Sequence, residues 1–156
     1  MTDGEYARRA HALRGRLYKT ALLQLGDETR ALDAVDEAVY KGLRGHRKLR
    51  QPEYFDTWLT RILLNECHNE QRRQQRVRPM DTLPETAAED FDALPLKEAV
   101  RRLPPELKDV VILRYFAGCT LEETARTLEI PAGTAATRQR RALGLLRLEL
   151  GEEDRP

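Results

Sequence analysis

Several features that define other protein classes are missing from this sequence. Only 6% of the residues are aromatic, and glycine and proline number nine and eight, a composition that favours helices over a β-sandwich. No apolar run approaches the roughly 20 residues that span a bilayer. The first residues also lack the apolar core of a signal peptide. These absences predict an all-α protein of the cytoplasm.

Signs of catalytic and metal-binding chemistry are absent as well. Cys67 and Cys119 lie far apart and form no CxxC pair, and His11, His46 and His68 are scattered without an HExxH spacing. The chain contains no serine, so it has no GxSxG motif, and it has no glycine-rich phosphate loop. The sequence therefore predicts no enzyme, no metal, no cofactor and no small-molecule substrate.

The small net charge of +1 hides a segregation of charge along the chain. Residues 1–80 carry 16 Lys and Arg against 11 Asp and Glu, residues 81–95 carry five acids and no base, and residues 96–156 carry 11 bases and 10 acids. The acidic stretch contains proline and little apolar content, which is typical of a linker. We therefore expect two small helical domains, 1–76 and 96–156, joined by an acidic linker over 77–95.

Helical periodicity accounts for the first domain. Apolar residues at a four-residue spacing predict a helix over 6–25. Gly26 is expected to end this helix, and Asp27 is expected to cap the next one. That second helix is expected over 29–43, and a third is expected to begin near Pro52. One apolar stripe of the second helix is predicted to face the core: Leu32, Val35, Val39 and Leu43.

The second domain is expected to contain a helix-turn-helix. Helices are predicted over 96–103 and 106–116, and the pair Thr120 and Glu123 matches a capping box at the start of a third, short helix. Pro131 prevents that short helix from running on, and a longer helix follows. A short helix, a tight turn and a longer helix in this order are typical of a helix-turn-helix.

The longer helix separates apolar from basic residues. On a wheel at about 100° per residue, Ala135, Ala142 and Leu146 share the face that is expected to pack on the partner helix. The free face is predicted to carry Ala136, Thr137, Arg140, Arg141 and Arg147. Arginine can donate two hydrogen bonds to a guanine edge, so this face suits the major groove of DNA. The alternative is an amphipathic helix with a solvated basic face.

Longer segments resemble a known family. The −35-element-binding domain of extracytoplasmic-function (ECF) sigma factors of bacterial RNA polymerase is similar to the segment LKEAVRRLPPELKDVVILRYFAGCTLEETARTLEIPAGTAATRQRRALGLLR. The family's −10-binding domain, which also docks on the polymerase clamp, is similar to LGDETRALDAVDEAVYKGL and PEYFDTWLTRILLNECHNEQRR. The resemblance covers about residues 10–148. It implies a non-catalytic subunit that brings core RNA polymerase to a set of promoters and helps to open them.

The resemblance also implies roles for individual residues. The residues implied to dock on the clamp helices of the β′ subunit are Asp33, Asp36 and Glu37. Those implied to melt and hold −10 DNA are Trp58, Arg61, Asn65, Arg72 and Arg73. Those implied at the −35 element are Thr137, Arg138, Arg140 and Arg141. The structural alternatives are a solvated acidic helix face for the first set and a core anchor for Trp58.

The chain departs from the family pattern at three positions. Asp36 stands where glutamine is common, Glu129 replaces the usual turn glycine, and Ala136 stands where a basic residue is frequent. The change at Ala136 removes a phosphate or base contact, so the family's usual −35 sequence preference is not carried over to this chain.

The family also implies partners. They are core RNA polymerase through its β′ clamp and β subunits, promoter DNA, and an anti-sigma factor, which is often membrane-anchored. The acidic linker would thread into the polymerase cleft as a mimic of nucleic acid, or serve only as a soluble spacer. Two other functions fit the residues alone: a free-standing helix-turn-helix repressor or activator, which binds duplex DNA as a dimer, and a helical adaptor that needs no DNA.

Overall fold

The computed structural model describes residues 1–77 and 94–151, and in these residues the protein is helical without any strand. The all-α prediction is therefore confirmed. The chain forms two compact units, and each is described by itself. The predicted linker over 77–95 falls, apart from its ends, outside the described residues, so its acidic spacer role and the domain limits at 76 and 96 stay predictions.

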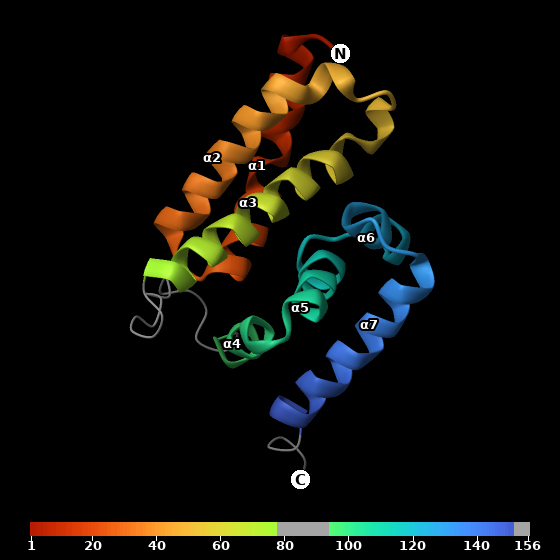
Figure 1. The fold of residues 1–156 in the computed structure, drawn as a ribbon. Helices are drawn as coiled ribbons and strands as arrows, with labels where there is room; N and C mark the ends of the chain where they lie inside the picture. Colours follow the sequence, from red (N-terminus) through yellow and green to blue (C-terminus); the bar gives the residue numbers. More distant parts are fainter. Residues whose placement is uncertain (78–93, 152–156) are drawn as a thin grey trace. The chain divides into compact units, whose positions relative to one another are not determined.

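Three long helices make up the described part of the first unit, residues 1–77. They are α1 (Asp3–Leu25), α2 (Glu28–Gly45) and α3 (Phe55–Val77). Helix α2 packs against both α1 and α3, and α1 also contacts α3 (Figure 1). Two short 3-10 turns, His46–Lys48 and Pro52–Tyr54, lie in the connection between α2 and α3.

The junction between α1 and α2 follows the local sequence. Gly26 adopts a left-handed conformation with a φ of 72°, and its N–H donates to the carbonyl of Leu22 at 2.7 Å. The Asp27 side chain then accepts a hydrogen bond from the Arg30 N–H at 3.1 Å. Both capping predictions are confirmed, because each depends on neighbouring residues only.

The predicted apolar stripe of α2 is wrong in its orientation. Val35 is fully buried, but Leu32 and Leu43 are 45% and 43% exposed. The face that α2 buries against the other two helices consists of small residues and one valine: Ala31, Ala34, Val35, Ala38 and Gly42. This face is rotated by roughly 80° from the predicted stripe. Small residues let the helix axes approach closely, and this packing decides which face is buried.

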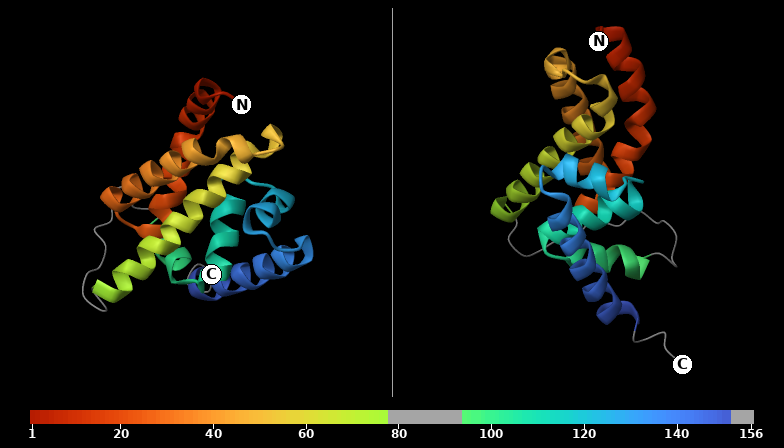
Figure 2. Two further views of the ribbon diagram at one scale, coloured as in Figure 1. Left: turned by 45° about the horizontal axis from the view of Figure 1, so that its top comes forward. Right: turned by 90° about the vertical axis from the view of Figure 1, so that its right-hand side faces the viewer.

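The second unit carries the helix-turn-helix. Helix α7 packs against both α5 and α6, as two further views show (Figure 2). The helices are α4 (Leu94–Arg102), α5 (Pro105–Val111), α6 (Leu121–Leu128) and α7 (Ala132–Leu146), with π-helical turns at Ile112–Phe116 and Arg147–Gly151.

The turn between α6 and α7 is set by its caps. The Thr120 hydroxyl accepts from the Glu123 N–H at 3.0 Å, and the Thr120 N–H donates to the Glu123 carboxylate at 2.8 Å, so the predicted capping box is confirmed. At the other end, the Ile130 N–H donates to the Ala125 carbonyl at 3.0 Å. This bond closes the helix in a Schellman-type turn. Glu129 occupies its left-handed position with a φ of 54°, a conformation in which glycine has no steric penalty.

Candidate nucleic-acid interface

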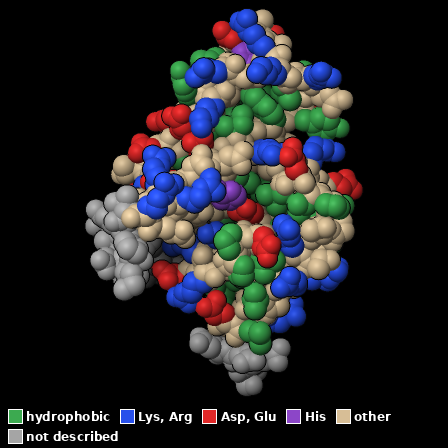
Figure 3. Space-filling model, viewed as in Figure 1, with side chains coloured by type: hydrophobic (Ala, Val, Ile, Leu, Met, Phe, Trp, Pro, Cys, Tyr) green, Lys and Arg blue, Asp and Glu red, His purple; other side chains and the backbone are tan. Residues whose placement is uncertain are grey.

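Helix α7 buries one face and exposes its arginines. Ala135, Ala142 and Leu146 are buried, as the wheel predicted. The exposed residues of the helix and of the turn that follows it include Thr137, Arg140, Arg141 and Arg147. In the space-filling view, Lys and Arg side chains stand on the surface over α7, at the lower right (Figure 3). The predicted division of this helix into a packing face and a basic face is therefore present in the structure.

Polar contacts distinguish the predicted −35 residues from one another. The Thr137 hydroxyl donates to the Gly133 carbonyl at 3.0 Å, and Arg140 Nη2 lies 3.4 Å from the same hydroxyl oxygen. Arg138 instead points toward α5, where its Nη2 lies 3.9 Å from Glu106 Oε2. The structure thus brings Thr137 and Arg140 together, with Arg141 exposed beside them, and sets Arg138 apart.

Most of the predicted −10 residues share one face of α3. At about 100° per residue, Trp58, Arg61, Asn65 and Arg72 fall within roughly 60° of one another. The strip extends over about 21 Å, because the helix rises about 1.5 Å per residue. Asn65 and Arg72 are exposed, while Arg61 and Trp58 are half-buried. We name these four residues the α3 strip.

Trp58 packs on the core with part of its side chain. Its ring lies 5.9 Å from the ring of Phe55, centroid to centroid, at an angle of 43°. Phe55 itself is fully buried. A Cβ at Gly45 would lie 3.7 Å from Trp58 Cζ2, so the backbone of the α2 end also borders the indole. The core-anchor alternative for Trp58 therefore describes part of the side chain, and the remainder is accessible.

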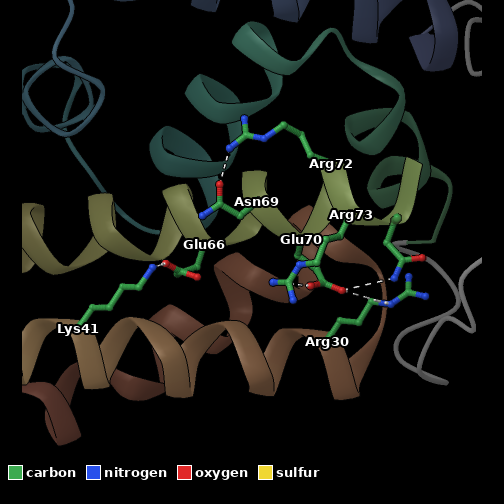
Figure 4. A network of polar contacts seen from close by, with 8 residues as sticks. Arg30, Lys41, Glu66, Asn69, Glu70, Arg72 and Arg73 are labelled. Carbon is green, nitrogen blue, oxygen red and sulfur yellow. Dashed lines mark hydrogen bonds and ion pairs between the residues drawn. The ribbon is translucent and has the colours of Figure 1, made fainter. Parts of the chain in front are cut away.

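Arg73 does not lie with the α3 strip. Its guanidinium is 3.1 Å from Glu70, and Glu70 is also 3.9 Å from Arg30 of α2. Arg72 donates to the side-chain oxygen of Asn69 instead. In the close view, Arg72 points away from α2 while Arg73 turns toward it (Figure 4). Two arginines that are adjacent in the sequence thus belong to different surfaces.

The predicted acidic docking face is also divided. Asp36 lies on the α1 side of α2 and is 2.6 Å from Arg14. Asp33 and Glu37 instead line a polar groove of about 550 Å³ between α2 and α3, together with Lys41, Glu66, Glu70 and Arg73. Lys41 pairs across this groove with the buried Glu66 (Figure 4). No sequence motif marks that pairing, because it joins residues of two separate helices.

Metal-binding and membrane-spanning features are absent from the residues that the structure describes. Within 1–77 and 94–151, no group of three or more His, Cys, Asp or Glu side chains is arranged to hold a metal ion. Cys67 and Cys119 are buried free thiols. No helix of the described part is long and apolar enough to cross a membrane.

Comparison with known proteins supports the same reading of both units. The family model for Sigma-70 region 2 matches residues 9–77, and that for Sigma-70, region 4 matches residues 93–146. RNA polymerase sigma factor SigV of Bacillus subtilis is 32% identical over 142 residues, which cover 88% of this chain and 86% of the relative. ECF RNA polymerase sigma factor SigM of Mycobacterium tuberculosis is 30% identical over 140 residues, which cover 86% of this chain and 71% of the relative.

Two solved structures share the fold. The sigma factor RpoE of Bartonella quintana, solved with the anti-sigma factor NepR, gives a TM-score of 0.79 at 20% identity and covers 97% of this chain and 99% of its own. CnrH, solved with the cytosolic domain of CnrY, gives 0.78 at 19% identity and covers 99% of this chain and 92% of its own.

The family models and the relatives agree on a transcription initiation factor that contains sigma-70 regions 2 and 4. The chain belongs to the sigma-70 family of RNA polymerase sigma factors, in its ECF group. It is not an enzyme, and it gives RNA polymerase promoter specificity in transcription initiation. The family predicted from the sequence is confirmed, and the free-standing regulator and the adaptor are set aside.

Proposed function

We propose that this sigma factor uses three separate surfaces, one for the −35 element, one for the −10 element and one for core polymerase. The observation that carries the proposal is the division of α7. Its buried side consists of Ala135, Ala142 and Leu146, which leaves Thr137, Arg140 and Arg141 exposed on one side of a helix-turn-helix. Recognition helices of this motif contact base edges with their N-terminal part.

Arg140 and Arg141 are the proposed −35 readers, and at least one of them contacts a base edge. Arg140 is already oriented by its contact with Thr137, at 3.4 Å. Arg138 has at most a supporting role at the DNA backbone, because its guanidinium approaches Glu106 of α5 instead of the side of Thr137 and Arg140. Arg147 begins the last, π-helical turn. It lies about 10 Å beyond Arg140 along the axis, so it contacts phosphate or nothing.

The α3 strip is the proposed −10 surface. Trp58 offers a half-buried aromatic ring, and an unpaired base can stack on the accessible part of its face. Arg61 and Arg72 would follow the phosphates of the melted strand, and Asn65 offers an amide to a base edge. Arg73, which turns toward α2, contributes positive charge to the groove beside Asp33 and Glu37 rather than to the strip.

The acidic residues of α2 are the proposed contact to the β′ clamp of core polymerase. Asp33 and Glu37 are exposed along the polar groove between α2 and α3. Asp36 pairs with Arg14, so it would contact the clamp only from the α1 side of the helix. The protein would act in the bacterial cytoplasm, where RNA polymerase works. The β subunit and an anti-sigma factor that covers these surfaces complete the proposed partners.

Promoter-directed transcription with purified core polymerase tests this proposal. Replacement of Arg140 and Arg141 by Ala should abolish the preference for promoters with the correct −35 element, whereas the matched change Arg147→Ala should not. If one arginine reads a base, its single variant should relax preference at one base position by roughly tenfold to a hundredfold. A phosphate contact would instead weaken all sequences alike and flatten the salt dependence. Intact promoter-specific transcription from the double variant contradicts the assignment.

Binding to core polymerase tests the acidic surface separately. Asp33→Lys with Glu37→Lys should weaken assembly, while Glu28→Lys with Glu53→Lys, which changes the net charge equally at exposed positions away from the groove, should not. Circular dichroism checks that both variants remain helical. Equal core affinity of the two double variants would remove Asp33 and Glu37 from the interface.

The proposal that an anti-sigma factor restrains this protein can be tested separately. If restraint comes from a partner, the purified chain with core polymerase should be fully active without any added ligand. An isolated protein that stays inactive until a small molecule or metal ion is added would contradict it.

A further inference from the structure

The first two turns of α1 contact the connection between α2 and α3 through side chains that no DNA-binding or docking role explains. The His46 ring is buried, and its Nε2 lies 2.6 Å from Asp3 Oδ1. The other ring nitrogen, Nδ1, is buried and has no hydrogen-bond partner among the residues that the structure describes. Because an ionised carboxylate can only accept, Nε2 donates the hydrogen bond to Asp3, and this contact fixes the orientation of the ring.

Tyr6 secures the same histidine from a second side. The two rings are stacked, with centroids 5.1 Å apart and planes 13° from parallel. The Tyr6 hydroxyl donates to the Val39 carbonyl at 2.5 Å, and its ring meets Phe55 edge to face at 5.7 Å. One buried side chain of α1 thus contacts α2, the connection after α2 and the first residue of α3.

Arg9 contacts the residues at the start of α3. Its Nη2 donates to the Pro52 carbonyl at 2.8 Å, and its guanidinium lies 4.6 Å above the centre of the Phe55 ring. A cation over an aromatic face is attracted by the ring quadrupole, and the bond to Pro52 fixes the backbone that leads into α3.

These contacts end at Phe55, which borders Trp58, and at His46, whose neighbour Gly45 also borders it. Gly45, which precedes His46, lies beside the indole, and Phe55 packs against its ring at 5.9 Å. We propose that Asp3, Tyr6 and Arg9 form a positioning element that holds the α2–α3 connection and thereby sets the orientation of Trp58. This inference rests on the proposed role of Trp58 at the −10 element.

The chain offers a direct probe and a matched control. Trp58 is the only tryptophan, so intrinsic fluorescence reports on this side chain alone. The test variant is Asp3→Asn with Arg9→Met, and the control is Glu5→Gln with Arg8→Met. Both remove one negative and one positive charge from the same two turns, and the control positions are exposed. Circular dichroism establishes that both variants keep their helices, and Arg9→Met alone serves if the double change does not fold.

The first readout is collisional quenching of Trp58 by acrylamide in the free protein. Loss of the two anchors should raise the quenching constant in the test variant and leave it unchanged in the control, because the ring becomes locally mobile. An equal quenching constant in the test variant and the parent protein would overturn the proposal.

The second readout is promoter opening by the holoenzyme, followed by permanganate reactivity of −10 thymines. The opening rate should fall roughly fivefold to tenfold in the test variant, with unchanged affinity for core polymerase. A promoter with a mismatched, pre-opened −10 element should restore the rate, which a general loss of folding would not allow. If Trp58→Ala impairs opening but the test variant opens promoters normally, the positioning element is refuted. If Trp58→Ala itself opens promoters normally, the −10 role of Trp58 fails, and the quenching result alone then decides the positioning element.

Discussion

Replacement of Gly42 by Ala should destabilise the first unit, although alanine is the better helix former. Gly42 lies inside α2, where Ala is favoured over Gly by about 1 kcal/mol in an open helix. Its neighbours leave no room for a methyl group, because a Cβ there would collide with the Tyr6 hydroxyl and lie 3.0 Å from Leu59 Cδ1. Overpacking of this kind costs about 1–3 kcal/mol.

The collision also threatens a hydrogen bond. The Tyr6 hydroxyl donates to the Val39 carbonyl, and displacement of the ring would cost about 0.5–1.5 kcal/mol more. After subtraction of the gain in helix propensity, the expected net loss in the free energy of unfolding is about 1–3 kcal/mol. For a unit of this size, that corresponds to a fall in Tm of roughly 5–20 °C.

The matched control is Gly15→Ala in α1. A Cβ at Gly15 meets nothing within 4 Å, so this variant should gain about 0.5–1 kcal/mol. Urea unfolding followed by Trp58 fluorescence measures the first unit alone, because the chain has a single tryptophan. In a Tyr6→Phe background, where the hydroxyl is absent, Gly42→Ala should cost less. The reasoning is refuted if both glycine replacements shift stability in the same direction, or if Tyr6→Phe leaves the cost unchanged.

Three further predictions concern caps and pH. Glu129→Gly should stabilise the second unit by up to about 1 kcal/mol, since it relieves a left-handed non-glycine residue at the cost of chain entropy; a lower Tm by circular dichroism would contradict this. Thr120→Ala removes the capping box and should cost about 0.5–2 kcal/mol in the same assay, with Thr120→Asp, which keeps a capping oxygen, as the control. The hydrogen bond from His46 lowers the pKa of Asp3, so its stabilising contribution is present above the ordinary Asp pKa of about 3.9 and is lost as the pH falls through the lowered value. Quenching of Trp58 should therefore rise at acid pH in the parent protein, and Asp3→Asn should show the raised quenching already at pH 7.

Structural features that depend only on residues close together in the sequence could be predicted from the sequence. The Gly26 and Asp27 caps, the capping box at Thr120 and the break at Pro131 each use contacts within one or two turns. The two faces of α7 follow from helical periodicity once one side is packed. The sequence also carried enough of the family pattern to identify a sigma factor, and the comparisons confirmed it.

Packing between helices determined which face of α2 is buried and which arginines lie together, two features that helical periodicity left open. A helix packed between two others has more than one plausible apolar face, and the close approach allowed by Ala31, Ala34 and Ala38 turned Leu32 and Leu43 of α2 outward. Sequence adjacency likewise suggested one basic cluster at Arg72 and Arg73. Glu70, itself paired with Arg30 of another helix, drew only Arg73 toward α2.

The contacts around His46 could not be predicted from the sequence either. Asp3, Tyr6 and Arg9 are ordinary residues of a charged amphipathic helix, and His46 is one of three scattered histidines. Their contacts join residues some 40 positions apart in the chain, as the 43-residue separations of Asp3 from His46 and of Arg9 from Pro52 show. Such pairings follow from how α1 lies along the other two helices. Local sequence determines where each helix begins, ends and carries its charge, whereas only packing determines which distant side chains meet.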